Sequence, residues 1–108
     1  MITELYSLQQ AKEFIEVKDI AVMVFSTRSC NVCKPLITKI NRVLHDYETI
    51  GFANVYIEEI KEAQGEYQVY TAPIVLLFVD GKEIKRYSAA MDILDFHKTI
   101  DRYNGLVN

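Results

Sequence analysis

The hydrophobic positions along the chain follow two patterns, one spaced as in helices and the other continuous as in buried strands. From Leu8 to Ile15, apolar side chains recur every three or four positions, which predicts a helix with one buried stripe. Ser7 precedes this stripe, and Gln10 lies three positions after Ser7. This pair is typical of the capping box at a helix start. The next segment, 20–25, is apolar at every position and favours a strand buried on both faces.

The same patterns continue toward the carboxyl end of the chain. Asp80-Gly81 is a strong signal for a two-residue hairpin turn, because both positions of that turn need a positive φ. Pro35 is expected in the first turn of a helix, where its missing N–H costs little. We predict a helix over 36–47, a strand over 52–57, a short helix over 60–67 weakened by Gly65, strands over 74–79 and 83–88, and a helix from near Asp92 that ends before Gly105.

This order of elements predicts an α/β fold in which a mixed central β-sheet carries helices on both faces. There is also room for a short strand before the first helix. The chain contains no internal repeat, low-complexity tract or Pro/Gly-rich linker, so we expect a single domain over 1–108.

Composition and charge exclude several classes of function. Half of the residues (50%) are hydrophobic and 25% are charged, as in globular proteins, and the net charge of −3 provides no basic surface for nucleic acid or anionic membranes. The longest apolar runs are too short to span a membrane, and residues 1–4 lack the pattern of a secretory signal. Tyr47, Tyr67 and Tyr103 fall on predicted apolar helix faces, so we expect them to pack in the protein instead of stacking on bases. We therefore expect a cytoplasmic monomer that binds neither nucleic acid nor membranes.

The two cysteines, Cys30 and Cys33, are the only ones in the chain and are separated by two residues. Closing so short a loop stabilises a fold by only about 2 kcal/mol, far less than closing a long loop. A reducing cytoplasm would also tend to break a merely structural bond. The spacing suits a bond that opens and closes repeatedly, because the second thiol is always within reach of the first. It therefore favours chemistry over architecture.

A metal site or a hydrolytic cysteine is the alternative interpretation of this pair. A structural zinc site needs four ligands at short spacings, whereas His45 and His97 are far apart in the sequence. A Cys–His dyad needs only proximity in space. Both histidines fall on predicted solvent faces of helices, which makes the dyad the weaker of the two alternatives. We expect no metal and no organic cofactor.

The predicted elements place the cysteines between the end of a buried strand and the start of a helix. The first turn of a helix presents unpaired N–H groups and about half a positive charge, which stabilises a thiolate, the reacting species in disulfide exchange. Arg28 and Lys34 add positive charge nearby. We expect Cys30, at the exposed end of the turn, to be the nucleophile and Cys33, one step inside the helix, to be the resolving thiol.

With these features the chain resembles the thioredoxin superfamily over nearly its whole length. The segment 30–34, Cys-Asn-Val-Cys-Lys, resembles the redox motif of that family and the lysine that commonly follows it. The segment 71–78 resembles the one that holds the family's cis-proline, and Asp80-Gly81 resembles the next hairpin turn.

This resemblance implies a substrate-binding role for Pro73 and Ala72. Pro73 would be cis and would face the cysteine pair across the active-site surface. Ala72 would offer its backbone groups to an extended substrate peptide, which would bind as an added strand. The residues that would support the site around the cysteines are Ser29, Asn31, Val32 and Lys34.

The chain departs from the family pattern around the motif. Ser29 stands where tryptophan is expected, and Asn31-Val32 stands where Gly-Pro is expected. Val24 takes the position of a buried acid that helps to deprotonate the second cysteine, and Asn54 takes that of its associated lysine. Ala89 replaces a surface glycine beside the site. We expect slower resolution of mixed disulfides than in a standard member of the family.

The resemblance implies a cytoplasmic thiol-disulfide oxidoreductase that reduces disulfide-containing protein substrates and serves redox homeostasis. A thioredoxin-reductase-like enzyme or a low-molecular-weight thiol would return the electrons. The alternative is a thioredoxin-fold module that binds proteins beside Pro73 with little redox turnover. An isomerase or oxidant role would need an oxidising compartment.

Overall fold

The computed structural model describes residues 2–107 and contains five strands and four helices. In chain order these are β1 (Thr3–Leu5), α1 (Leu8–Val17), β2 (Ile20–Ser26), α2 (Cys33–Leu44), β3 (Gly51–Tyr56), α3 (Lys61–Tyr67), β4 (Ile74–Val79), β5 (Lys82–Tyr87) and α4 (Ile93–Val107). The predicted order is confirmed, including a short first strand. The ends of the predicted domain, Met1 and Asn108, lie outside the described residues.

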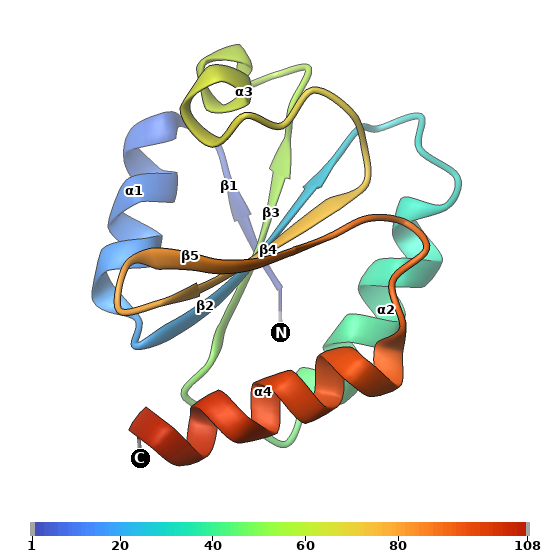
Figure 1. Ribbon diagram of the computed structural model, residues 1–108. Helices are drawn as coiled ribbons and strands as arrows, with labels where there is room; N and C mark the ends of the chain where they lie inside the picture. Colours follow the sequence, from blue (N-terminus) through green and yellow to red (C-terminus); the bar gives the residue numbers. More distant parts are fainter. Residues whose placement is uncertain (1, 108) are drawn as a thin grey trace.

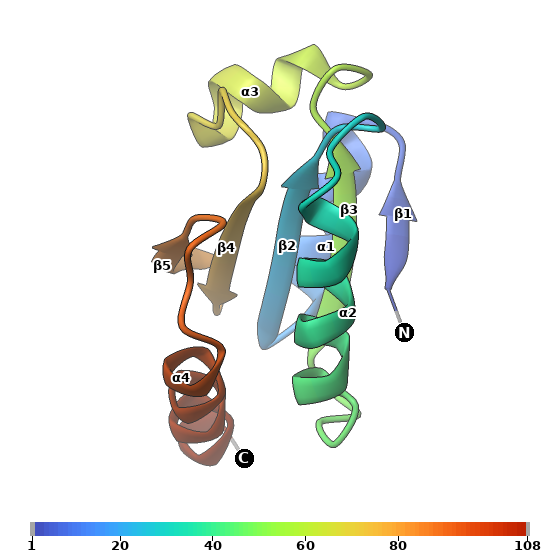
Figure 2. The same cartoon turned by 90° about the vertical axis from the view of Figure 1, so that its right-hand side faces the viewer.

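The five strands form one mixed sheet in the order β1-β3-β2-β4-β5. β1, β2 and β3 are parallel, whereas β4 and β5 are antiparallel to their neighbours. α1 and α3 cover one face of the sheet, and α2 and α4 cover the other (Figures 1 and 2). The predicted α/β fold is therefore confirmed.

The central strand β2 is buried along its whole length. Its residues alternate between the two faces: Val22 and Val24 join the core beneath α2 and α4, while Met23 and Phe25 join the core beneath α1 and α3. Because both faces of this strand are covered, its sequence is continuously apolar. No helix among residues 2–107 has the length and apolarity that crossing a bilayer requires.

Two short-range signals also produce the expected structure. The Ser7 hydroxyl accepts a hydrogen bond from the Gln10 backbone N–H at 3.1 Å, which caps α1. The Gln10 side chain reaches back to the backbone N–H of Tyr6 at 2.8 Å, one residue before the usual partner in a capping box. Asp80 and Gly81 adopt φ values of 51° and 81°, as the hairpin turn between β4 and β5 requires.

The predicted end of the last helix was wrong. α4 does not stop before Gly105 but includes it and continues to Val107. A glycine inside a helix costs about 1 kcal/mol relative to alanine, yet it ends a helix only when it adopts a left-handed conformation. Val107 packs against the core beneath α2 and α4, and this contact favours the additional turn.

Other boundaries also differ from the prediction. β3 and β5 cover 51–56 and 82–87 where 52–57 and 83–88 were expected, β2 extends to Ser26, and α2 covers 33–44 where 36–47 was expected. β3 begins at Gly51, which pairs with Ala21 of β2, and β5 begins at Lys82, which pairs with Val79 of β4. In both cases the backbone pairing starts before the apolar or β-branched residues do. Hydrophobicity therefore located β3 and β5 but not their first residues, whereas the first residues of β2 and β4 were predicted correctly.

Candidate active site

The connection from β2 to α2 forms the centre of the candidate site. After Ser26 the chain turns back at the carboxyl ends of the parallel strands and enters α2 (Figure 2). The Cys30 backbone N–H donates to the Thr27 carbonyl at 3.2 Å, which closes a turn before the helix. The first helical hydrogen bond of α2 runs from the Leu36 N–H to the Val32 carbonyl at 3.4 Å.

Cys30 and Cys33 are joined by a disulfide bond, with 5.4 Å between their Cα atoms. The two residues differ in exposure, since Cys33 is only 2% exposed and Cys30 is half-buried. An incoming partner can therefore reach the sulfur of Cys30 more readily than that of Cys33.

Their positions relative to α2 refine the prediction. Cys33, not Cys30, is the first residue of the helix, and Cys30 lies in the turn before it. Pro35 lies in the first turn as predicted, where its missing N–H removes no helical hydrogen bond. The N–H groups of Cys33 and Lys34 precede the first acceptor that the helix could offer them, so they remain as donors. These donors and the positive end of the helix favour negative charge on a neighbouring sulfur.

The expected contribution of Arg28 to the charge around the cysteines was wrong. The guanidinium of Arg28 forms an ion pair with Glu59, with one N–H to Oε1 at 3.2 Å, and lies over the ring of Tyr56 at 4.3 Å. The Arg28 backbone N–H donates to Glu58 at 2.9 Å. Hydrogen bonding to Arg28 lowers the pKa of the Glu59 carboxyl, so the pair keeps its two opposite charges.

Arg28 therefore acts as a clamp between two loops instead of a free positive charge. Its contacts tie the segment before Cys30 to the loop between β3 and α3. Lys34, by contrast, is exposed and takes no part in the ion pairs found in residues 2–107. It is thus the cation next to Cys33 whose charge is not neutralised by a salt bridge.

The segment before β4 lies at the same end of the sheet as the cysteines. The Ala72–Pro73 peptide bond is cis, as the resemblance implied. Ile74, the next residue, pairs with Phe25 near the carboxyl end of β2. Ala72 is half-buried, and no backbone–backbone hydrogen bond outside the helices and strands of residues 2–107 involves it.

The supporting positions around the cysteines lie at the surface. The exposed side chains are those of Ser29, Asn31, Val32 and Lys34. Val32 is 57% exposed, which is unusual for a branched apolar residue. It therefore offers an apolar surface to a partner at a position between the two cysteines in the sequence.

A polar chain across three strands was missed in the sequence. The buried Ser26 hydroxyl donates to Asn54 Oδ1 at 2.6 Å, and the Asn54 amide donates to Glu4 at 3.0 Å. Val24, in register with Asn54, is fully buried and apolar. The available signal was an asparagine inside the apolar run of β3, because a buried amide needs partners.

The histidines lie away from the cysteines. His45 follows α2, and twelve helical steps from Cys33 correspond to about 18 Å. His97 Nε2 lies 3.2 Å from the hydroxyl of Tyr47, beyond the same end of α2. This geometry argues against a Cys–His dyad. Within residues 2–107, no three His, Cys, Asp or Glu residues are grouped to hold a metal ion.

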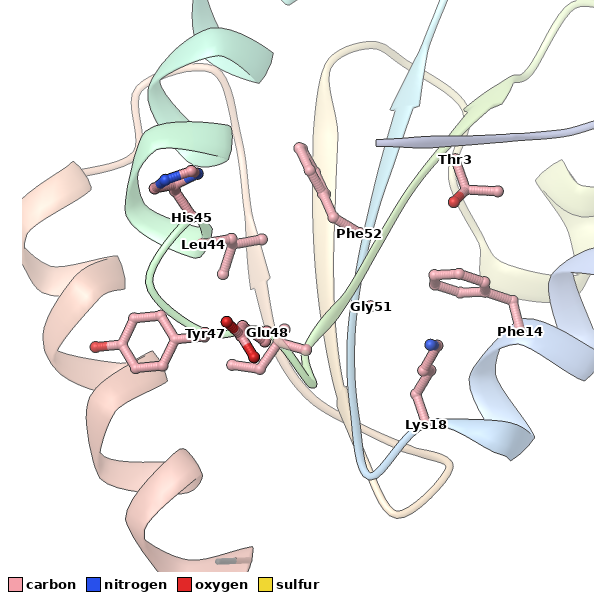
Figure 3. Close-up of a pocket in the computed structure, with 10 residues that line it drawn as sticks. Thr3, Phe14, Lys18, Leu44, His45, Tyr47, Glu48, Gly51 and Phe52 are labelled. Carbon is pink, nitrogen blue, oxygen red and sulfur yellow. The ribbon is translucent and has the colours of Figure 1, made fainter. Parts of the chain in front are cut away.

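A cavity of about 340 Å³ lies at the opposite end of the sheet from the cysteines (Figure 3). Gly51 at the start of β3, Phe14 and Lys18 of α1, and Glu48 contribute to its wall. Because β1, β2 and β3 are parallel, the first residues of β3 are remote from the loop that follows β2. This cavity is therefore separate from the candidate active site.

Comparison with known proteins identifies relatives over most of the chain. A family model described as Thioredoxin matches residues 4–102. Thioredoxin-like protein YdfQ of Bacillus subtilis is 29% identical over 85 residues, covering 79% of this chain and 76% of that protein. The thioredoxin of Mycoplasma genitalium is 25% identical over 104 residues, covering 96% of this chain and 99% of that protein. A mutant thioredoxin from Halobacterium salinarum has the same fold, with a TM-score of 0.84 at 18% identity over 94% of this chain and 89% of that chain.

Proposed function

Because the matching family model spans residues 4–102, the chain belongs to the thioredoxin family, and we propose that it reduces protein disulfides with Cys30 as nucleophile and Cys33 as resolving thiol. The observation that carries these roles is the unequal exposure of the two bonded cysteines. Cys30 is half-buried in an open turn, whereas Cys33 is 2% exposed in the first turn of α2. A partner sulfur can thus approach the first cysteine, and only an intramolecular attack can use the second.

The reaction transfers two electrons from the cysteine pair to the partner. The Cys30 thiolate attacks one sulfur of the partner disulfide, forms a mixed disulfide and releases the other partner sulfur as a thiolate. Cys33 loses its proton and attacks the Cys30 sulfur, which forms the Cys30–Cys33 bond and releases the second partner sulfur. Both partner thiolates then take up protons. The N–H groups at the start of α2 favour the thiolate forms in both steps.

We propose that Ala72 and Pro73 hold the substrate beside the cysteines. Ala72 has peptide groups without a backbone partner, and the pairing of Ile74 with Phe25 brings this segment to the end of β2. An extended substrate chain could pair with these groups as an added strand. Ser29, Asn31 and Val32 would frame the approach to Cys30.

The oxidised pair must regain two electrons after each turnover. A thioredoxin-reductase-like enzyme or a low-molecular-weight thiol would supply them. We propose a cytoplasmic location, because a reducing compartment keeps such a pair in its dithiol form. Protein disulfides are the substrate class that membership of the family implies.

Insulin reduction tests this proposal. We expect the wild-type protein to precipitate the insulin B chain in the presence of dithiothreitol, and Cys30→Ser to lose this activity. Cys33→Ser should accumulate a mixed disulfide, detected as a covalent adduct by mass spectrometry. Equal activity of wild type and Cys30→Ser would contradict the assigned nucleophile, and no activity in either would favour a protein-binding module.

A further inference from the structure

A groove of about 250 Å³ lies beside the cysteine pair, between the start of α2 and the segment that follows β5. In Figure 1 this segment runs past the first turns of α2 on its way to α4. The groove is lined by Asn31, Val32, Pro35, Leu36, Lys39 and Ala89. It does not include Ala72 or Pro73, so it is separate from the proposed strand-pairing site.

The wall of this groove nearest the cysteines is apolar. Val32 is 57% exposed, and Leu36 is buried beside it. Pro35 and Ala89 complete an apolar lining without carboxylates. An apolar side chain placed here would remove this surface from water, which favours binding in proportion to the area buried.

The other end of the groove carries positive charge. Lys39 is exposed and takes part in none of the ion pairs found in residues 2–107. Its neighbours one helical turn away, Pro35, Leu36, Arg42 and Val43, include no carboxylate. The macrodipole of α2 favours Arg42 in its last turn, but it gives no such reason for a cation in mid-helix.

The surroundings make this charge a local exception. The chain as a whole has a net charge of −3, yet no acidic residue occurs between Arg28 and Asp46, where Lys34, Lys39 and Arg42 are all cationic. The side chains that α2 itself offers to a partner near the cysteines are therefore cationic or neutral, on a protein that is acidic as a whole. Such a surface selects partners of opposite charge.

We propose that this groove binds the segment of a substrate protein next to its half-cystine, with an apolar side chain against Val32 and Leu36 and an acidic side chain facing Lys39. The proposal rests on the function proposed above and specifies its substrate: a disulfide with an apolar and an acidic residue close to it in the sequence. The contact involves binding only and leaves the exchange chemistry to Cys30 and Cys33.

Two disulfide peptides that differ only in this acidic residue test the proposal, one with glutamate and one with lysine. We expect the wild type to reduce the glutamate peptide with about five-fold higher kcat/KM, and the preference to shrink as salt screens the charges. Lys39→Glu should abolish or reverse the preference. Lys82→Glu, the same charge change at the far hairpin, should retain it. Lys82→Glu should reduce bis(2-hydroxyethyl) disulfide, which is uncharged, at the wild-type rate. For Lys39→Glu the readout is the ratio of its rates with the two peptides, in which any change in the reactivity of Cys30 cancels.

A non-reactive probe separates the groove from the proposed function. The glutamate peptide with serine in place of cysteine should bind to wild type about five-fold more tightly than to Lys39→Glu. Binding with this preference but without disulfide reduction would contradict the proposed function and support the groove. The groove assignment would be overturned if the glutamate and lysine peptides bound equally well. It would also be overturned if glutathione alone displaced both peptides.

Discussion

Ser26 on β2 and Asn54 on β3 are joined by a hydrogen bond of 2.6 Å between fully buried side chains, on the same face of the sheet as α2. The Asn54 amide N–H in turn donates a second hydrogen bond, of 3.0 Å, to the carboxylate of Glu4 on β1. Both hydrogen bonds run in one direction, from Ser26 to Asn54 and from Asn54 to Glu4. The Glu4 carboxylate therefore acts only as an acceptor. The three strands are thereby linked through side chains as well as through their backbones.

This link predicts a large effect for a substitution that keeps the size of the residue but removes its polar groups. Asn54→Leu would leave the Ser26 hydroxyl and the Glu4 carboxylate without their partner. We expect the free energy of unfolding to fall by about 1–3 kcal/mol, measured by urea denaturation. The double variant Ser26→Ala/Asn54→Leu should lose less than the sum of the single losses, because the hydroxyl is then absent. An Asn54→Leu protein as stable as wild type would show that the link contributes nothing.

The polar chain also marks the limit of what the sequence could predict. The apolar runs of β2 and β4 identified these strands because a strand buried on both faces admits few polar residues. The contacts of Asn54 with Glu4 and of Arg28 with Glu59 join residues 50 and 31 positions apart. No periodicity relates such positions, since their proximity depends on the strand order of the whole sheet. The sequence therefore located Cys30, Cys33 and Pro73 but assigned Arg28 the wrong electrostatic role.

The Arg28–Glu59 pair predicts a change in the reactivity of Cys30. Glu59→Gln would remove the negative partner and leave the guanidinium charge near the cysteine turn. We expect the reduced protein to be alkylated at Cys30 about twofold faster at pH 7, since an extra charge several ångströms away in water lowers a thiol pKa only slightly. The double variant Arg28→Ala/Glu59→Gln removes both charges and should return to the wild-type rate. A faster rate in the double variant as well would attribute the effect to loosening of the loop.

Gly51 predicts a steric effect at the far end of the sheet. A Cβ atom at this position would lie 2.7 Å from the ring of Phe14 and 2.9 Å from Lys18 Cγ (Figure 3). Lys18 can move aside, but the ring of Phe14 packs against the core, so Gly51→Ala should cost about 1–3 kcal/mol of stability. Gly65→Ala in α3 is the matched control, because nothing lies within 4 Å of its Cβ. It should stabilise the protein by about 0.5–1 kcal/mol, and chemical denaturation of both variants would show whether the two signs differ.

Tyr67 predicts a loss of stability in strong alkali. Burial, with a smaller contribution from Glu66, raises the pKa of the Tyr67 hydroxyl to about 12. The unfolded chain would lose this proton near pH 10. The contribution of Tyr67 to the free energy of unfolding is therefore fully present below pH 10 and is lost as the pH rises toward 12. For a partly exposed ring we expect this loss to be about 1–2 kcal/mol. Tyr67→Phe should be less sensitive to pH over this interval in urea denaturation, and identical pH profiles for the two proteins would contradict the assignment.

Val24 predicts a gain of function at a cost in stability. It is fully buried on the α2 face of the sheet, in register with Asn54 and Val75, and its side chain has no group that can accept a proton. Val24→Asp would place a carboxylate there, so Cys33 should be deprotonated more readily and mixed disulfides should resolve faster in stopped-flow measurements. Burying this carboxylate should cost several kcal/mol, because the buried polar side chains beside it, Ser26 and Asn54, already bond to each other. Val24→Asn has the same size without an ionisable group, so it should be destabilised without becoming faster. If Val24→Asp resolves mixed disulfides no faster than Val24→Asn, proton removal from Cys33 does not limit the reaction.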